Sequence, residues 1–535
     1  MAHVQFLNLL IEGVNRRRKI KPDMVKGEKQ FLQANLLCDE RRYEEAVVEY
    51  QKAIKLGLKD DKLVYNNLGV AYDSLEHHNK ALECYRNSIR IDPNYEVAWY
   101  NMGNAFSYME DFNKAIRCYS KALQLNPDYR IAEYDMGLVL AQLGKTRKAL
   151  DAYDSITEKH PEDPIAWYRK GILLEQVDRL LEAAEAYRRA IKIEPKFLDA
   201  WNGMGNALYA MESYEQAIDA YDEAIMVDPK NEEAWNNKGF TYFMLGIHDK
   251  AIESYDKAIE LNPRYKHAWY NKGYTFHGMD RLEEAIVCYE MALEIDKSDE
   301  VLWNNLGNAL YNLGRYEESL PYFFEAIEVN PDYEIAWNNI GNALDKMGRH
   351  EESVQFHDRS LDIKPDFDYA LYAKGHALTN QGRLEEGLEL INESLELNPN
   401  YDHSWYAKAE TLVKMDMVED ARDALNNSLI LNPGFEEAWV FRGKLMIDMS
   451  NFEEAQICFS EALRCLDYIL LMSPNNIHAL NEKGDLLLEL GRFNEAAVCF
   501  DRILETNDED VNVWTKMAQA LMSAGDPSEA VESLR

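Results

Sequence analysis

The sequence is short of positive charge and of long hydrophobic runs. Its 58 Lys and Arg residues stand against 94 Asp and Glu residues, which gives a formal net charge of −36. An acidic surface repels phosphate backbones and anionic membranes, so we expect neither nucleic acid nor a membrane to be a partner. No stretch approaches the ~18 consecutive apolar residues of a membrane span. The composition predicts a cytoplasmic protein.

Cysteine is also scarce, with seven residues in a chain of 535. Five of them occupy one position of the repeat described below: Cys84, Cys118, Cys288, Cys458 and Cys499. Equivalent sites in adjacent helical units lie ~8–10 Å apart, beyond the ~7 Å limit for a disulfide. We therefore expect free structural thiols in a reducing compartment.

Motifs that carry catalysis are missing as well. The sequence contains no HExxH, paired CxxC, Walker loop or nucleophile elbow. The glycine-rich stretch GMGNAL, residues 203–208, belongs to the repeat itself. We predict no catalytic residue, no cofactor and no metal, and hence a protein that is not an enzyme.

What the sequence does contain is a repeat of 34 residues that starts at about Gly27. All ten tryptophans fall on position 4 of a unit. Position 8 is Gly or Ala, position 20 is small, and position 24 is usually bulky, as in Gly307, Ser319 and Phe323. Small residues opposite large ones let two helices approach closely. Each unit therefore reads as a helical hairpin.

The residues that end the two helices of each unit also support the hairpin. Glycine often stands at position 15, where a first helix can end in a left-handed residue, and proline usually closes the unit at position 32. This pattern resembles the tetratricopeptide repeat (TPR) family. The resemblance implies an all-α, right-handed α-solenoid, a superhelix of about 15 hairpins with the first helices lining its concave groove.

The predicted organisation follows from the register. Residues 1–26 form an N-terminal capping helix with a basic segment, and residues 27–535 form a continuous array of 14 full units and one partial unit. The full units start near residues 27, 62, 96, 130, 164, 198, 232, 266, 300, 334, 368, 402, 436 and 477. In unit 13 the closing proline is delayed to Pro474, which predicts a lengthened second helix at about 453–473.

Asparagine is unusually frequent in the first helices, although it is a poor helix former. At 100° per residue, positions 5, 6 and 9 lie opposite the side that packs on the second helix, so we expect these amides to face the groove. A ladder of amides can hold an extended peptide through its backbone. The predicted groove residues are Asn202, Asn206, Asn236, Asn237, Asn271, Asn304, Asn305, Asn308, Asn338, Asn339, Asn342, Tyr270 and Tyr274.

The ladder resembles that of the TPR half of O-GlcNAc transferase. The alternative interpretation is that the asparagines only satisfy neighbouring groups between units. For function, we predict a non-enzymatic scaffold that binds an extended peptide or disordered segment. The alternative is a regulatory or substrate-recruiting subunit of an enzyme on a separate chain, for example a glycosyltransferase.

Two further surfaces are expected to contact proteins. The added stretch of unit 13 places Tyr468, Ile469, Leu471 and Met472 on more than one side of the helix, which predicts a second docking surface or local packing against the loop before Ile477. The array also stops at Arg535, within the second helix of its last unit. Solenoid ends need a polar cap, so we expect self-association or further chain there.

Overall fold

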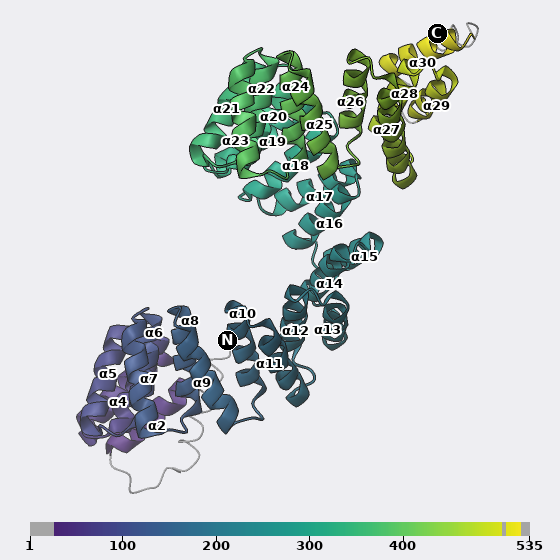
Figure 1. Ribbon diagram of the computed structural model, residues 1–535. Helices are drawn as coiled ribbons and strands as arrows, with labels where there is room; N and C mark the ends of the chain where they lie inside the picture. The colour runs from purple at the N-terminus through teal and green to yellow at the C-terminus, as the bar shows by residue number, and fades with distance from the viewer. Residues whose placement is uncertain (1–25, 506–509, 526–535) are drawn as a thin grey trace. The chain divides into compact units, whose positions relative to one another are not determined.

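The computed structural model describes residues 26–505 and 510–525, and Figure 1 shows a succession of antiparallel helical hairpins. The chain divides into an N-terminal body, residues 1–271, and a C-terminal body, residues 272–535. The division falls within α16 (Lys266–Gly278). The described residues contain no β-strand, so the predicted all-α solenoid is confirmed.

The N-terminal body contains α2 (Lys26–Asp39), α3 (Tyr43–Ala53), η1 (Ile54–Leu58), α4 (Lys62–Ser74), α5 (His78–Ile91), α6 (Glu96–Tyr108), α7 (Phe112–Leu125), α8 (Arg130–Gln142), α9 (Thr146–Lys159), α10 (Pro164–Gln176), α11 (Leu180–Ile193), α12 (Leu198–Ala210), α13 (Tyr214–Val227), α14 (Glu232–Met244) and α15 (His248–Leu261). Even-numbered labels are first helices of units, and odd-numbered labels are second helices.

The C-terminal body contains α17 (Leu282–Ile295), α18 (Glu300–Asn312), α19 (Tyr316–Val329), α20 (Glu334–Lys346), α21 (His350–Ile363), α22 (Asp368–Asn380), α23 (Leu384–Leu397), α24 (Asp402–Lys414), α25 (Val418–Leu431), α26 (Glu436–Asp448), α27 (Phe452–Met472), α28 (Ile477–Glu489), α29 (Phe493–Leu504) and α30 (Val511–Ala524). The first helices begin within a residue of the predicted unit starts. The N-terminal segment before Lys26 and the end of the partial unit lie outside the described residues.

Each hairpin interior is built from a glycine and a large side chain. An added Cβ on Gly307 would lie 2.6 Å from Cε1 of Phe323. The same relation joins Gly205 to Tyr221 at 2.4 Å. Because no real Cβ packs that closely, position 8 must stay small while position 24 fills the hairpin. The small-to-large pattern read from the sequence is therefore confirmed.

The turn inside each hairpin needs a left-handed residue at position 15. Gly314 takes φ 76° there and Gly348 takes φ 75°. Where glycine is absent the backbone keeps the same conformation, as in Glu110 at φ 59° and Ser450 at φ 61°. The geometry of the hairpin therefore holds these L-residues in the left-handed region of φ, which they normally disfavour.

The tryptophans at position 4 join consecutive units. Nε1 of Trp337 donates to the carbonyl of Pro331 at 2.9 Å, six residues earlier. The bond survives where proline is replaced, because Trp303 Nε1 donates to the carbonyl of Lys297 at 2.9 Å. The tryptophan therefore clamps the link between a second helix and the following first helix.

Two units depart from the pattern, and the backbone absorbs both changes. Unit 1 carries one extra residue, which is taken up by the π-helical turn η1 and by Gly57 at φ 120°. In unit 13, α27 runs as one helix of 21 residues, whereas its neighbours α25 and α23 have 14. A lengthened second helix was expected at this place.

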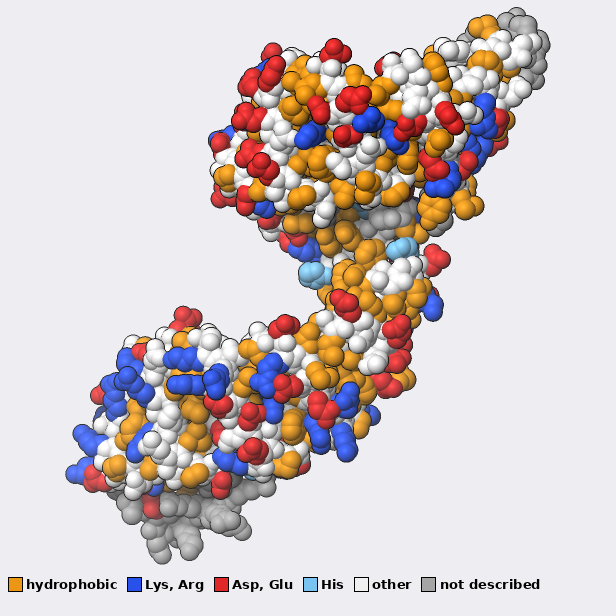
Figure 2. Space-filling model, in the orientation of Figure 1, with side chains coloured by type: hydrophobic (Ala, Val, Ile, Leu, Met, Phe, Trp, Pro, Cys, Tyr) orange, Lys and Arg blue, Asp and Glu red, His pale blue; other side chains and the backbone are white. Residues whose placement is uncertain are grey.

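Basic side chains are unevenly distributed over the surface. On the face shown in Figure 2, Lys and Arg side chains gather over the helices that Figure 1 colours purple to blue.

Six of the seven free cysteines are buried, and Cys465 is half-buried. Burial raises the pKa of the Cys84 thiol to about 12, which keeps it protonated. Among the described residues, no helix combines the length and apolarity needed to cross a membrane.

Candidate functional site

The asparagines at position 5 are buried. Asn202, Asn236, Asn304 and Asn338 are 3–7% exposed. The prediction that this position faces the groove is therefore wrong, because the first helix of the neighbouring unit covers that side of the helix. Buried amides need partners, since an unsatisfied one costs ~1–3 kcal/mol.

For Asn236 and Asn304 the partner comes from position 6 of the next unit, whereas Oδ1 of Asn202 has no hydrogen-bond partner among the described residues. Nδ2 of Asn339 donates to Oδ1 of Asn304 at 2.8 Å. In the N-terminal body, Nδ2 of Asn101 donates to Oδ1 of Asn66 at 2.9 Å, and Asn271 bonds Asn236 in the same way at 2.9 Å. We call this bond between consecutive first helices the amide staple. It gives the structural interpretation of the ladder a definite geometry.

In the N-terminal body the staple extends into a longer network. Nδ2 of Asn236 donates to Oδ1 of Asn237 at 3.1 Å, and Nδ2 of Asn237 donates to Oδ1 of Asn206 at 3.2 Å. The hydroxyl of Tyr221 also donates to Oδ1 of Asn206, at 2.7 Å. The network therefore ties the groove-side amides to the tyrosine that fills the hairpin. Asn271 starts this chain of bonds through its staple to Asn236.

The same network occurs at the start of the array. Asn66 donates to Asn67 at 3.2 Å, Asn67 donates to Asn35 at 3.2 Å, and Tyr50 donates to Asn35 at 2.6 Å. Asn35 was missed among the sequence candidates because these were taken from units 6 to 10, although the register from residue 27 places it at position 9. Asparagine at position 9 with tyrosine at position 24 is the signal that identifies it.

Position 9 provides the amides that are open to a ligand. Asn206 is exposed, and Asn308 and Asn342 are half-buried. No side chain or backbone group in the described part of the chain hydrogen-bonds the amides of Asn308 and Asn342. Their neighbours at position 6, Asn305 and Asn339, are half-buried as well.

The aromatic residues of the first helices divide into packed and exposed ones. Tyr100 is 4% exposed and its hydroxyl donates to Asp135 at 2.8 Å. Tyr372 packs edge-on against Tyr401, with ring centroids 5.2 Å apart. Tyr270 is half-buried, whereas Tyr274 is 46% exposed. Of the two predicted tyrosines, Tyr274 presents the larger surface to a ligand.

A histidine replaces the hairpin-filling aromatic residue in unit 10. His357 is fully buried, its ring atom Cε1 lies 2.5 Å from the place of a Cβ on Gly341, and its Nδ1 lies 2.9 Å from Oδ1 of Asn338. Burial lowers the pKa of His357 to about 3, against the attraction of Asp345. The ring is therefore neutral at physiological pH, and its Nδ1 hydrogen-bonds the side-chain amide of Asn338.

Next to it, a charged row crosses three first helices. Oδ2 of Asp345 lies 3.1 Å from Nδ1 of His376, whose Nε2 lies 3.4 Å from Oε2 of Glu410. Burial opposes charge on His376, but the two carboxylates outweigh it and raise its pKa to about 9. The groove side of units 10 to 12 therefore carries ionised side chains, whereas the groove side of the preceding units carries amides.

Comparison with known proteins identifies the repeat. Tetratricopeptide repeat models match residues 63–95, 97–129, 232–265, 267–299 and 301–333, residues 134–196, residues 459–520, and residues 335–367 and 369–401, and a TPR repeat model matches residues 205–246. Together these ranges cover more than half of the chain. The chain belongs to the tetratricopeptide repeat family. No curated protein sequence matches it.

Solved structures are similar to part or most of the chain. YrrB, described as a TPR protein with an unusual peptide-binding site, is 25% identical, with a TM-score of 0.32 over 36% of this chain and 98% of its own. The Cut9–Hcn1 hetero-tetramer of the APC/C is 13% identical, with a TM-score of 0.38 over 86% and 96% of the two chains. Yeast Tom70 is 16% identical, with a TM-score of 0.40 over 90% and 99%.

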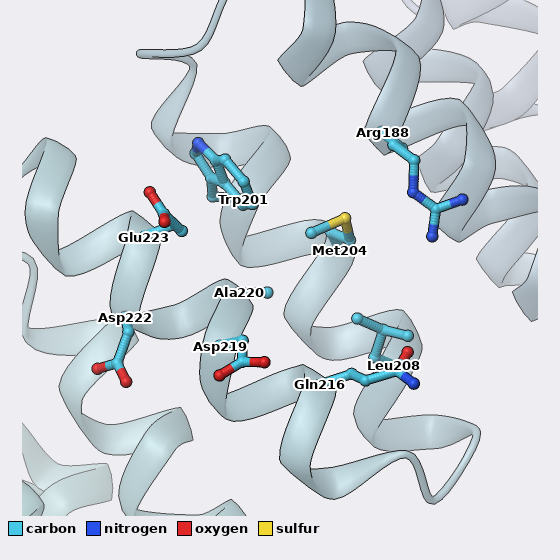
Figure 3. A pocket seen from close by; sticks show the side chains of 9 residues that line it. All are labelled: Arg188, Trp201, Met204, Leu208, Gln216, Asp219, Ala220, Asp222 and Glu223. Atoms are coloured by element: carbon cyan, nitrogen blue, oxygen red, sulfur yellow. The ribbon is translucent and has the colours of Figure 1, made fainter.

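A cavity of this TPR array lies away from the amides. Figure 3 shows it between α11, α12 and α13, with a volume of about 450 Å³. Trp201, Met204 and Leu208 line it from α12, Arg188 from α11 and Glu223 from α13. No asparagine of the ladder lines it. Five of its nine lining residues lie on the second helix α13, so it is separate from the groove candidate.

The predicted second docking surface is partly exposed on the long TPR helix α27. Tyr468 is 65% exposed and Leu471 is 75% exposed, whereas Ile469 packs partly against the core. The side chain of Met472 lies outside the described residues. Docking at this surface remains a prediction.

Proposed function

We propose that this TPR array is a non-enzymatic scaffold whose first-helix groove binds an extended segment of a partner protein. The observation that carries the proposal is the pair of amides at Asn308 and Asn342, half-buried and without a hydrogen-bonding partner among the described residues. Each offers two donors and an acceptor, the complement of a peptide backbone.

The staple behind these amides supports the same proposal. Asn304 and Asn339 are bonded at 2.8 Å, which fixes the relative position of α18 and α20. Equivalent sites on packed helices lie ~8–10 Å apart. An extended chain advances ~3.3 Å per residue, so the two free amides match backbone groups about three residues apart. Recognition of this kind is tolerant of sequence, as a scaffold requires.

A selection followed by a titration tests the proposal. Twelve-residue peptides selected from a displayed random library on the full chain are titrated by fluorescence polarisation. Replacing Asn308 and Asn342 with Ala removes about two hydrogen bonds of ~1 kcal/mol each, so affinity should fall about 10- to 30-fold. The matched control is Asn392→Ala with Asn427→Ala, two asparagines on the second helices α23 and α25.

The result that contradicts the proposal is equal affinity of the two double variants, with circular dichroism unchanged in both. The alternative function, an enzyme-recruiting subunit, predicts in addition a stable enzyme that co-purifies with the chain. The cytoplasm is the compartment that we propose for either function.

A further inference from the structure

The amide staple is missing between α26 and α28. Its two positions are occupied there by Val440, at position 5 of unit 13, and by Glu482, at position 6 of unit 14. The next junction has a polar pair again, because Nζ of Lys516 donates to Oδ1 of Asn481 at 2.9 Å. The three junctions before it lack the staple as well, because positions 5 and 6 hold Asn338 and Ala373, Tyr372 and Ala407, and Tyr406 and Phe441.

A cavity of about 320 Å³ opens at this unstapled junction, and we call it the α26–α28 pocket. Its apolar lining comes from four helices and includes Tyr406, Phe441, Leu466 and Leu486. The rings of Tyr406 and Phe441 meet edge-on with centroids 5.7 Å apart. Both Val440 and Glu482 line the pocket, so it occupies the place of the missing staple.

The polar lining of the pocket is anionic. Glu436, Glu437 and Glu482 line it, and no Lys, Arg or His within the described ranges forms an ion pair with any of the three. The one cation in the lining, Lys444, is already held by Glu489 at 3.0 Å. Burial raises the pKa of Glu436, and the charges of Glu437 and Glu482 raise it further, against a backbone hydrogen bond and the attraction of His478. The pocket therefore carries negative charge that its own lining does not neutralise.

The size and walls of the pocket decide between two kinds of cation. Glu436, Glu437 and His478 could hold a metal ion, because their ligand atoms lie within 4.8 Å of one another. An ion would leave most of a 320 Å³ cavity unfilled, since one water takes only ~30 Å³. A long side chain with a planar cationic head fills the space, stacks on aromatic rings and pairs with carboxylates in a bidentate manner.

We propose that the α26–α28 pocket binds the side chain of an arginine from a partner segment that lies along the groove. The proposal rests on the proposed function for the identity of the partner, and it adds the chemistry that the partner must present. A bound segment would combine backbone contacts at the amides with one basic anchor residue.

The test uses a probe that does not need the amides. N-acetylarginine methylamide is titrated into the full chain, with the methyl NMR signals of Leu466, Leu486 and Val440 as the readout. The neutral isostere N-acetylcitrulline methylamide is the matched ligand control. We expect saturable shifts of these methyls with the arginine probe and at least fivefold weaker binding of the citrulline probe.

Two variants with the same change of charge sharpen the test. Glu437→Gln with Glu482→Gln should weaken the arginine probe about tenfold, whereas Glu393→Gln with Glu396→Gln on α23 should leave it unchanged. Equal binding of the citrulline probe, or an equal loss in both variants, would overturn the proposal. So would stoichiometric Zn²⁺ binding that the arginine probe cannot displace, because the pocket would then be a metal site.

Failure of this inference is distinguishable from failure of the proposed function. Asn308→Ala with Asn342→Ala should leave the response to the arginine probe intact, because the amides lie on other helices. Loss of library-peptide binding with an intact arginine response speaks against the groove alone. Intact peptide binding without an arginine response speaks against the pocket alone.

Discussion

Two junctions of the C-terminal body join hairpins of the same kind, but their first helices contact each other through different residues. Between α18 and α20, Asn304 and Asn339 form the staple at 2.8 Å. Between α26 and α28 the same two positions hold Val440 and Glu482 and border a cavity. The two junctions therefore differ in the contact between units, whereas their hairpins are built alike.

The interior of the hairpin should not distinguish the two junctions. A Cβ on Gly307 would lie 2.6 Å from Phe323, and a Cβ on Gly443 would lie 2.5 Å from Phe459. Gly307→Ala and Gly443→Ala should each cost about 2 kcal/mol through overpacking. Native-state hydrogen exchange of the affected hairpin measures the loss. The control is Gly434→Ala, whose added Cβ meets only Oδ1 of Asn432 at 3.4 Å.

A large loss at Gly307 with none at Gly443 would contradict this equality. The hairpins would then differ internally, and the contact between units would not be the only difference between the two junctions.

Acid should weaken the stapled region through His357. Its pKa is lowered from 6.5 to about 3, so its stabilising effect is complete above pH 6.5 and is lost as the pH falls towards 3. The loss should be about 1.4 kcal/mol per pH unit below 6.5. His357→Phe, which restores the type of residue found at Phe323, should remove this part of the pH dependence. Urea midpoints at pH 6.5 and 5.5 measure it.

The pKa of His376 is shifted in the opposite direction, so its effect on stability serves as an internal comparison. Its pKa is raised to about 9, so its stabilising effect is complete below pH 6.5 and is lost as the pH rises through 9. If His357→Phe kept the full acid sensitivity between pH 6.5 and 5.5, another group would be responsible.

The smallest expected effect isolates the staple itself. A double-mutant cycle with Asn304→Ala and Asn339→Ala should give a coupling energy of about 1 kcal/mol, the net value of a hydrogen bond. The same cycle at Val440 and Glu482 should give a value near zero. Chemical denaturation of the four proteins of each cycle measures both. Coupling of equal size at the two junctions would show that the staple is not what separates them.

The sequence predicted the repeat, its register and the hairpin because these depend on local spacing. Tryptophan at position 4, a small residue at position 8 and a bulky one at position 24 are contacts within one unit or across one short link. The lengthened α27 was also readable, since seven added residues keep nearly the same helix face. Asn35 was also readable from the register, but the candidates were taken from units 6 to 10.

The side of the helix on which Asn304 lies could not be read in this way. A helical wheel considers one hairpin, in which position 5 points away from the second helix, whereas the structure covers it with the next first helix. The α26–α28 pocket likewise depends on residues 42 apart in sequence, Val440 and Glu482, brought together after the longer α27. The sequence by itself determined the unit, because its contacts are local. Only the tertiary structure decided which amides are buried between units and where a pocket replaces them, because stacking of one unit on the next sets both.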